Sequence, residues 1–274
     1  MRPNARAIVT LFFLSAALAG CSAPVASTQS ESSAQPATHA TPGPLPTGPV
    51  GKLASYGRDI LNDTPKYMKS YVRADMSCSA CHLQSGTQAR GGSLVGIYAR
   101  FPQYNKRAHR VIALQDRIAE CFLYSMNGHP PAYQSKEMTA MVAYFAYLSA
   151  GTPVGAKQDP SIAYDKFSPP SPPDKGHGAQ LYSQKCSMCH QASGAGVSGQ
   201  FPPVWGAKSF NAGAGMHRLG TMASFVRHNM PLGAPNTLSA QEAYDVSAFI
   251  LSHPRPAFAK DASIVFPPEK ASYF

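Results

Sequence analysis

Two copies of one short motif, Cys-x-x-Cys-His, are the residues of this sequence whose types and spacing most clearly specify a chemistry. The motif consists of Cys78, Cys81 and His82 in the first copy, and of Cys186, Cys189 and His190 in the second. Two thiols at this spacing form thioethers to one porphyrin, and the adjacent histidine ligates its iron. A thioredoxin-like redox pair does not require a histidine in fifth place twice, and a zinc site combines its ligands differently. The sequence therefore predicts two covalently bound haem c groups.

The first of the two remaining cysteines, Cys21, ends the segment Leu-Ala-Gly-Cys near the start of the chain. A basic start precedes this segment, followed by an apolar run over residues 8–19 that is too short to span a bilayer. This pattern predicts a signal peptide over residues 1–20 and, because small residues lie in register before the cysteine, lipidation of Cys21. An ordinary secretory signal that is cleaved nearby is the alternative. We expect a periplasmic lipoprotein that is anchored to the membrane.

Changes in composition divide the rest of the chain. Residues 21–50 are rich in Ser, Thr, Ala, Pro and Gly, which predicts a flexible tether. A second Pro-rich stretch, residues 151–174, is predicted to be a linker between two domains of ordinary small size, residues 51–150 and 175–256. The sequence of the C-terminal tail, residues 257–274, predicts no function.

The chain is basic, and its charge points to anionic partners. The formal net charge is +10, and it falls to +8 when Arg2 and Arg6 are removed with the signal peptide. Such a surface attracts anions at long range, although a basic surface that only aids solubility or docking to an acidic partner is equally compatible with the charge. No basic tract interleaves with aromatic residues, so nucleic acid is not an expected partner.

The two domains form an internal repeat that predicts the fold class. Each begins with a helical stretch before its haem motif, at residues 52–62 and 176–185, and each ends in an amphipathic helix, at residues 136–149 and 242–252. This is the plan of a class I cytochrome c domain, in which the haem supplies much of the core. We therefore expect an all-α protein made of two tandem class I cytochrome c-type domains that are joined by the Pro-rich linker, with little or no strand.

The sixth ligand of each iron must come from the stretch between the haem motif and the last helix. In the second domain Met230 lies 40 residues after His190 and is followed by Pro231, a common arrangement for a thioether ligand. In the first domain Cys121 lies 39 residues after His82. A cysteine thus occupies the position where an electron-transfer cytochrome would keep methionine. The alternative is that Cys121 is a small buried side chain and that the ligand is another residue, namely Met126, His109 or His129.

The neighbours of Cys121 favour a chemical role for it. Helical periodicity over residues 111–128 places Arg117, Cys121 and Ser125 on one face, because they are spaced by four. A positive charge beside the thiol lowers its pKa and favours the thiolate. Further arginines lie between the first haem motif and this helix, namely Arg90, Arg100, Arg107 and Arg110. Some of them are expected to bind haem propionates or to face solvent, and we expect Arg107 and Arg117 to contact an anionic substrate.

Three segments carry a resemblance to the thiosulfate dehydrogenase family: residues 96–104, residues 117–128 and residues 201–206. The similarity extends over both haem domains, from about residue 51 to residue 254. The resemblance implies dihaem enzymes that join two thiosulfates into tetrathionate and release two electrons, some of which act mainly in reverse as tetrathionate reductases. Soft sulfur chemistry of this kind suits a thiolate among arginines.

The resemblance also implies roles for single residues. It implies that His82 and Cys121 ligate the catalytic haem, and that Arg107, Arg117 and Ser125 line the substrate site. For the second haem the family uses Met, in some members alternating with a Lys immediately before it. This sequence has Asn229 in that place, so we expect a fixed pair of ligands, His190 and Met230.

These observations lead to a mechanism and two alternatives. We expect Cys121 to leave iron and form a covalent adduct with the sulfane sulfur of one thiosulfate, from which a second thiosulfate releases tetrathionate. Electrons then pass from the first haem to the second and to a soluble cytochrome or other acceptor. One alternative is a dihaem relay between respiratory partners with no substrate of its own. The other is a sulfur carrier in which Cys121 holds a sulfur species for a partner enzyme.

Overall fold

The computed structural model of the chain describes residues 43–258, all of which lie within one compact unit. The predicted signal peptide, most of the predicted tether including Cys21, and residues 259–274 of the predicted tail lie outside the described residues. No helix within residues 43–258 combines the length and the apolar character that are needed to cross a membrane.

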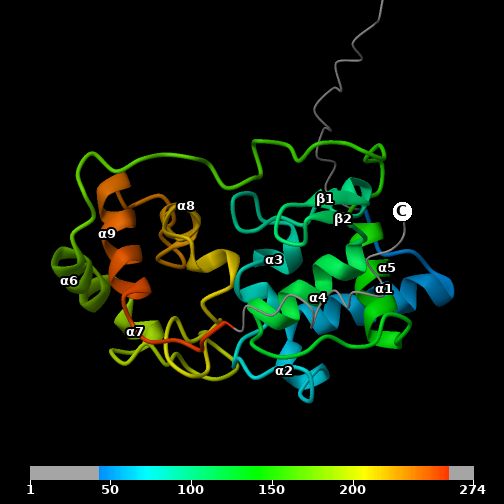
Figure 1. The fold of residues 1–274 in the computed structure, drawn as a ribbon, viewed down its shortest axis with the longest axis horizontal. Coiled ribbons are helices and arrows are strands. Elements are labelled where there is room, and N and C mark those ends of the chain that lie inside the picture. Colours follow the sequence, from blue (N-terminus) through cyan, green and yellow to red (C-terminus); the bar gives the residue numbers. More distant parts are fainter. Residues whose placement is uncertain (1–42, 259–274) are drawn as a thin grey trace, which may run out of the picture. The chain divides into compact units, whose positions relative to one another are not determined.

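Helices α1 and α5 form the frame of the first domain (Figure 1). In chain order its elements are α1 (Gly48–Asn62), α2 (Thr64–Tyr67), the 3-10 helix η1 (Cys78–Ala80), α3 (Leu83–Gly86), the 3-10 helix η2 (Tyr98–Arg100), β1 (Gln103–Asn105), β2 (Arg110–Ile112), α4 (Leu114–Tyr124) and α5 (Lys136–Tyr147). The hydroxyl of Ser135 caps α5 by accepting a hydrogen bond from the Met138 amide. Apolar side chains of α1, α4 and α5, such as Leu61, Phe122 and Met141, pack together as the core.

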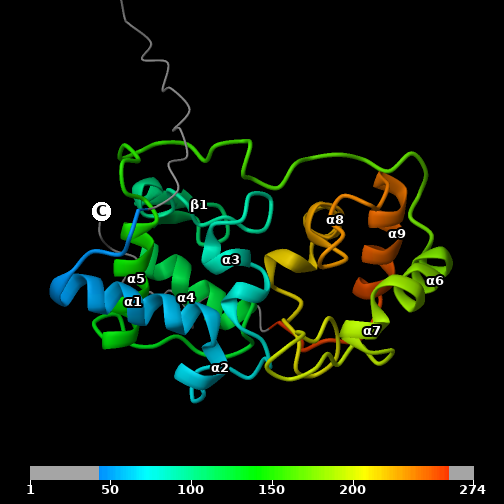
Figure 2. The ribbon, with the colours of Figure 1, turned by 180° about the vertical axis from the view of Figure 1, so that it is seen from behind.

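Helices α6 and α9 form the same frame in the second domain (Figure 2). The elements of this domain are α6 (Lys175–Lys185), α7 (Ser187–His190), the 3-10 helix η3 (Gly215–His217), α8 (Leu219–Asn229) and α9 (Ala240–Leu251). Asp174 caps α6 through its carboxylate, and Ser239 with Glu242 forms a capping box at the start of α9. The four helices predicted at the ends of the two domains are therefore confirmed, with boundaries that differ by at most four residues.

Both frames depend on a glycine at the helix crossing. A Cβ atom on Gly57 of α1 would lie 2.1 Å from the Ala140 carbonyl oxygen of α5. A Cβ atom on Gly178 of α6 would likewise lie 2.1 Å from the Asp245 carbonyl oxygen of α9. The absence of a side chain at these positions lets each pair of helices approach backbone to backbone, so the internal repeat extends to the packing of the helices.

A short antiparallel hairpin agrees with the prediction of little or no strand, but it interrupts the helix predicted over residues 111–128. Strand β1 pairs with β2, with Gln103 opposite Ile112 and Asn105 opposite Arg110. The helix predicted over residues 111–128 consequently begins only at Leu114 and ends at Tyr124. The prediction was wrong for Val111 and Ile112 because β-branched residues satisfy a strand as well as a helical period. The Asp116 side chain, which accepts a hydrogen bond from the Ala113 amide at 3.0 Å, helps to set the later start of α4.

The predicted linker makes specific contacts with both domains. The Ile162 carbonyl accepts a hydrogen bond from the Arg90 amide in the loop after the first haem motif. The Asp165 carboxylate accepts hydrogen bonds from Ser224 and His228 of α8, both at 2.8 Å. The linker therefore connects the loop of the first haem motif to the helix that precedes Met230.

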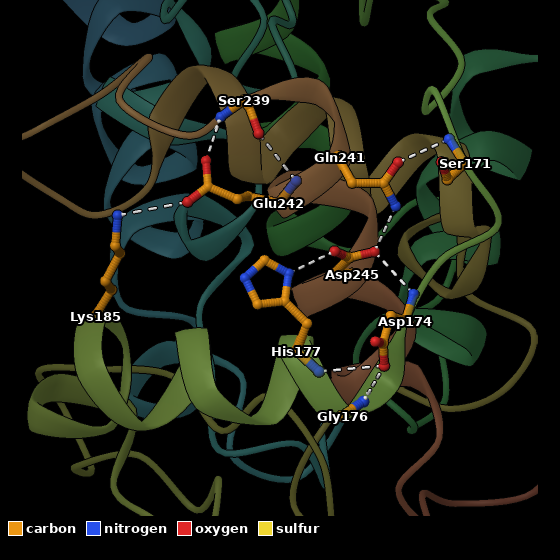
Figure 3. Close-up of polar contacts among 9 residues, drawn as sticks. All are labelled: Ser171, Asp174, Gly176, His177, Lys185, Ser239, Gln241, Glu242 and Asp245. Atoms are coloured by element: carbon orange, nitrogen blue, oxygen red, sulfur yellow. Dashed lines mark hydrogen bonds and ion pairs between the residues drawn. The ribbon is translucent and has the colours of Figure 1, made fainter.

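A buried carboxylate, Asp245 of α9, ties together the linker and the two frame helices of the second domain (Figure 3). Its oxygens accept hydrogen bonds at 2.8 Å from the Asp174 amide, from His177 Nδ1 and from Gln241 Nε2. Gln241 in turn accepts a hydrogen bond from the Ser171 amide at 2.9 Å. Although burial alone would raise it, these hydrogen bonds hold the pKa of Asp245 below its usual value.

We predict that Asp245→Ala destabilises the second domain by about 3 kcal/mol at neutral pH, because it leaves three donors around a buried site without their acceptor. Since the pKa of Asp245 is lower in the folded state, its contribution is complete above the unfolded value of about 3.9 and is lost as the pH falls through the folded pKa. Urea unfolding of wild type and variant at pH 7 and at pH 3 measures both effects. Equal differences in unfolding free energy at the two pH values would contradict the assignment of the charge to this site.

Candidate functional site

Both Cys-x-x-Cys-His motifs present the groups that covalent haem attachment requires. All four motif cysteines are free thiols, and no disulfide occurs within residues 43–258. The Nδ1 atom of His82 donates to the Gly92 carbonyl, and that of His190 donates to the Pro202 carbonyl at 2.9 Å. These hydrogen bonds fix the tautomer and leave each Nε2 atom available to ligate iron. Burial lowers the pKa of both histidines, which keeps the rings neutral as ligation requires.

A cavity of about 630 Å³, lined mainly by the second domain and partly by the first, has the size of a cofactor site. Cys186, Cys189, His190 and Met230 all line it, so the structure brings the second motif and its predicted sixth ligand to one space. Met230 follows directly after α8 and precedes Pro231. The cavity also reaches Cys81 of the first motif, so the two haem-binding sites are neighbours.

In the first domain, Cys121 on α4 lies close to the first haem motif. Burial raises the pKa of the Cys78 thiol to about 11 and that of the Cys81 thiol to about 12, and the charge of Cys121 contributes to both shifts. Arg117, one helical turn before Cys121, has its pKa raised mainly by Cys121. The helical face predicted for Arg117, Cys121 and Ser125 is formed, because α4 continues in regular geometry to Ser125.

Positive charge gathers on this side of Cys121. Arg117 is 46 % exposed, and its Nη1 atom is paired with the Glu120 carboxylate at 3.2 Å. The pKa of Arg100 is lowered by burial and by the nearby charge of Arg117, so these two guanidinium groups lie within electrostatic reach of each other. An anion beside Cys121 would relieve the repulsion between them.

Arg107, the other arginine predicted to contact substrate, lies against the second domain. Its guanidinium donates to the Gly213 carbonyl of the second domain at 3.0 Å and lies over the Tyr124 ring, 4.1 Å from the ring centroid. It lines a second cavity of about 320 Å³ together with His217 and Arg218. Its contacts with α4 thus run through Tyr124, and the structure does not bring it against Arg117.

The alternative ligands for the first haem lie in less suitable places. Met126 is 2 % exposed and packs in an apolar cluster with Ala74 and Phe210. His129 is exposed and lies beside the Tyr71 ring, and His109 is exposed in the turn between β1 and β2. These positions favour Cys121 over the other three candidates.

Buried donors without partners give an independent test of the fit to haem. Among the described residues they include Nε of Arg100 in the first domain and Nε and Nη1 of Arg255 in the second. The Arg255 guanidinium packs on the ring of Phe210, which lines the larger cavity, and burial lowers its pKa to about 10. Buried unpaired donors are costly, and the carboxylate of a haem propionate has the charge and geometry to satisfy them. The residues present therefore fit haem in both domains.

Sequence reasoning missed several residues that shape these sites. Thr64, which is fully buried, donates through its hydroxyl to the Ile60 carbonyl at 2.8 Å, and the same oxygen accepts from the Cys78 amide at 3.0 Å and lies 3.3 Å from Cys78 Sγ. Tyr164 comes from the linker, and its hydroxyl lies near Gly92, whose carbonyl holds His82. A lone threonine and a tyrosine within a Pro-rich stretch carry no sequence signal for such roles. No group of three or more His, Cys, Asp and Glu side chains that could hold a further metal ion occurs in residues 43–258.

Two helical domains, each with a haem-attachment motif and a sulfur side chain near it, define a dihaem c-type cytochrome. Residues 65–154 match the family model described as "SoxA/TsdA, cytochrome c domain", and residues 176–254 match the model described as "Cytochrome c". These matches confirm the prediction of two tandem class I cytochrome c domains and of two covalently bound haem c groups.

Similarity to known proteins places the chain more narrowly. It is 42% identical to a thiosulfate dehydrogenase of Allochromatium vinosum, with 78% of this chain and 82% of that protein aligned. It is 40% identical to a thiosulfate dehydrogenase of Thiomonas intermedia, with 90% and 82% aligned. The solved thiosulfate dehydrogenase (TsdBA) of Marichromatium purpuratum superposes with a TM-score of 0.74 at 35% identity, covering 80% of this chain and about half, 49%, of that longer chain. The chain belongs to the thiosulfate dehydrogenase family.

Proposed function

We propose that this protein oxidises two thiosulfates to one tetrathionate at its first haem-binding site and passes the two released electrons out through the second. The identity of 36–42% to four thiosulfate dehydrogenases supports the activity. The observation that carries the proposal within this chain is the position of Cys121, which lies near the first haem motif and one helical turn from Arg117.

Cys121 acts as the nucleophile in this proposal. Its thiolate bonds to the sulfane sulfur of one thiosulfate, and two electrons leave as the sulfur–sulfur bond of a cysteine S-thiosulfonate forms. The sulfane sulfur of a second thiosulfate then attacks the outer sulfur of that bond, so tetrathionate departs and the Cys121 thiolate is restored. The first step releases two electrons and the second exchanges one sulfur–sulfur bond for another, so we propose that the same site, supplied with two electrons, also reduces tetrathionate by the reverse steps.

Positive charge makes the meeting of two dianions feasible. Unit charges 4 Å apart near a protein surface interact with about 4 kcal/mol, so two unscreened thiosulfates repel each other strongly. Arg117 lies where it offsets this repulsion beside Cys121, and Ser125 follows on the same face. Arg107, packed on Tyr124 and lining the second cavity, extends the positive field away from Cys121.

Cys78, Cys81 and His82 would hold the first haem with Cys121 as its sixth ligand, and Cys186, Cys189, His190 and Met230 would hold the second. When bound, the haems supply the one-electron acceptors that the reaction needs, the second at a potential raised by its methionine. Asn229 is 5 % exposed, and its amide donates to the Arg90 carbonyl at 2.9 Å and to the Phe225 carbonyl at 3.0 Å. Its side chain is thus engaged, which supports a fixed pair of His190 and Met230.

The proposal also covers the location of the protein and its electron acceptor. We propose that the chain is exported to the periplasm, is held at the membrane by a lipid on Cys21, and delivers electrons to a soluble cytochrome or another acceptor. The sequence pattern before Cys21 supports the export and the lipid.

Turnover by the purified holoprotein tests the proposed activity. With thiosulfate and an artificial one-electron acceptor, we expect one tetrathionate and two reduced acceptors for every two thiosulfates consumed. A protein that turns over neither thiosulfate nor tetrathionate, while its haems exchange electrons with redox dyes, would be an electron relay. A stable adduct on Cys121 in mass spectra, without release of tetrathionate, would instead indicate a sulfur carrier.

A further inference from the structure

We propose that Glu120 is a positioning residue of the anion site, which holds Arg117 beside Cys121 and, through Asn105, the turn that carries Arg107. Glu120 lies on α4 immediately before Cys121, and no sequence signal distinguishes it from an ordinary helical glutamate. The inference rests on the proposed function for the identity of the anion as thiosulfate. The ion pair of Glu120 with Arg117 and its hydrogen bond with Asn105 support the inference.

The Glu120 carboxylate is buried and divided between two partners. Its side chain is 4 % exposed, its Oε2 atom is paired with Arg117 Nη1 at 3.2 Å, and its Oε1 atom accepts a hydrogen bond from Asn105 Nδ2 at 3.1 Å. A buried carboxylate keeps its charge only when such partners satisfy it. Glu120 therefore fixes the guanidinium from one side while Arg117 remains 46 % exposed on the other.

Asn105 passes this constraint to the hairpin. Its Oδ1 atom accepts hydrogen bonds from the Arg107 amide at 2.8 Å and from the Ala108 amide at 3.1 Å, which makes the turn after β1. The same side chain donates to Glu120 through Nδ2. One buried carboxylate thus connects the helix that bears Arg117 and Cys121 with the turn that bears Arg107.

The negative charge of Glu120 and its contact with Arg117 have opposite expected effects on the binding of an anion. A carboxylate next to an anion site repels the anion, so its charge alone weakens binding. A carboxylate that orients an arginine strengthens binding, because the guanidinium no longer loses side-chain freedom when the anion arrives. Arg117 has five N–H donors and spends one on Glu120, so donors remain for an anion. The geometry indicates that the second effect is the larger.

The variant Glu120→Gln separates these effects, because it keeps the shape of the side chain and removes its charge. If Glu120 positions Arg117, we expect the KM for thiosulfate to rise about tenfold, with a smaller change in kcat. We also expect about tenfold weaker binding of sulfate, an inert dianion, measured from its effect on the spectrum of the first haem in the oxidised holoprotein. The low-spin EPR signal of the thiolate-ligated haem should persist, which shows that Cys121 is still in place.

Asp116→Asn is the matched control, since Asp116 is a buried carboxylate on the same helix. It accepts hydrogen bonds from the Ala113 amide and the Tyr133 hydroxyl and forms an ion pair with Arg110 at 3.8 Å, and within residues 43–258 it has no hydrogen bond or ion pair with Arg117 or Asn105. Its KM and sulfate affinity should remain within about twofold of wild type, although its stability falls. Asn105→Ala keeps Glu120 and should raise the KM as well, and the double variant should show less than the product of the two single effects.

The outcomes separate this inference from the proposed function. An unchanged or lower KM together with unchanged or tighter sulfate binding in Glu120→Gln would show that its charge dominates and would overturn the positioning role, while thiosulfate turnover by wild type still supports the enzyme. If wild type lacks turnover but Glu120→Gln and Asn105→Ala both weaken sulfate binding, the enzyme proposal fails and the positioning role stands. If Glu120→Gln does not fold, Asn105→Ala decides, and unchanged sulfate binding in that variant contradicts the inference.

Discussion

Cys121→Gly is expected to reduce thiosulfate turnover at least ~1,000-fold, because the variant lacks the nucleophile on which both sulfur-transfer steps depend. Glycine leaves the iron of the first haem without its proposed sulfur ligand, so the EPR signal of a low-spin thiolate haem should disappear. The second haem, whose ligands lie in the other domain, should keep its spectrum and its potential. Steady-state turnover and low-temperature EPR on the same samples measure both effects.

The alternative ligands provide controls for this result. His129→Ala and His109→Ala remove exposed histidines and should leave turnover and both haem spectra unchanged. The ligand would be a histidine if the first haem stays low-spin in Cys121→Gly and loses its low-spin signal in His129→Ala or in His109→Ala. Full activity in Cys121→Gly would exclude the covalent mechanism regardless of ligation.

Local pattern was sufficient to predict the four frame helices and most of α4. Helices α5 and α9 carry apolar residues at helical spacing and begin at a serine cap, so their positions follow from the sequence. Helices α1 and α6 were predicted from their place before each haem motif. The hairpin β1–β2 was not predicted, because its strands have three residues each and Val111 and Ile112 satisfy both periods. The close helix packing at Gly57 and Gly178 was also not predicted. It depends on which backbone lies opposite each glycine, and a single sequence does not contain that information.

In the candidate site, too, relations between residues near in sequence could be predicted and contacts between distant segments could not. Residues that are close in sequence, such as Arg117, Cys121 and Ser125, were placed correctly on one helical face because the period of the helix fixes their relation. Arg107, whose predicted contact with substrate stays a prediction, packs on Tyr124 and donates to the Gly213 carbonyl of the other domain. Such contacts between distant segments are set by tertiary packing and have no local signature.

The helix crossing of the second domain is expected to tolerate no side chain at position 178. In Gly178→Ala the new Cβ would lie 2.1 Å from the Asp245 carbonyl oxygen and 2.9 Å from Phe249 Cβ, and neither atom belongs to the far end of a flexible side chain. Helices α6 and α9 must therefore move apart, which opens the core around the second haem. We predict a loss of about 3 kcal/mol in the unfolding free energy of this domain, with overpacking as its cause.

Gly220→Ala is the matched control, because Gly220 also lies in a helix, α8, and a Cβ there meets only the Tyr244 hydroxyl at 3.5 Å. Alanine has the higher helix propensity, so this variant should be as stable as wild type or more stable by up to about 1 kcal/mol. Urea unfolding followed at the haem absorption of each domain should show the loss in Gly178→Ala confined to the second haem. Gly57 lies against the Ala140 carbonyl in the same geometry, so Gly57→Ala should destabilise the first domain and show its loss at the first haem. A Gly178→Ala protein that is as stable as Gly220→Ala would show that the helices separate at little cost.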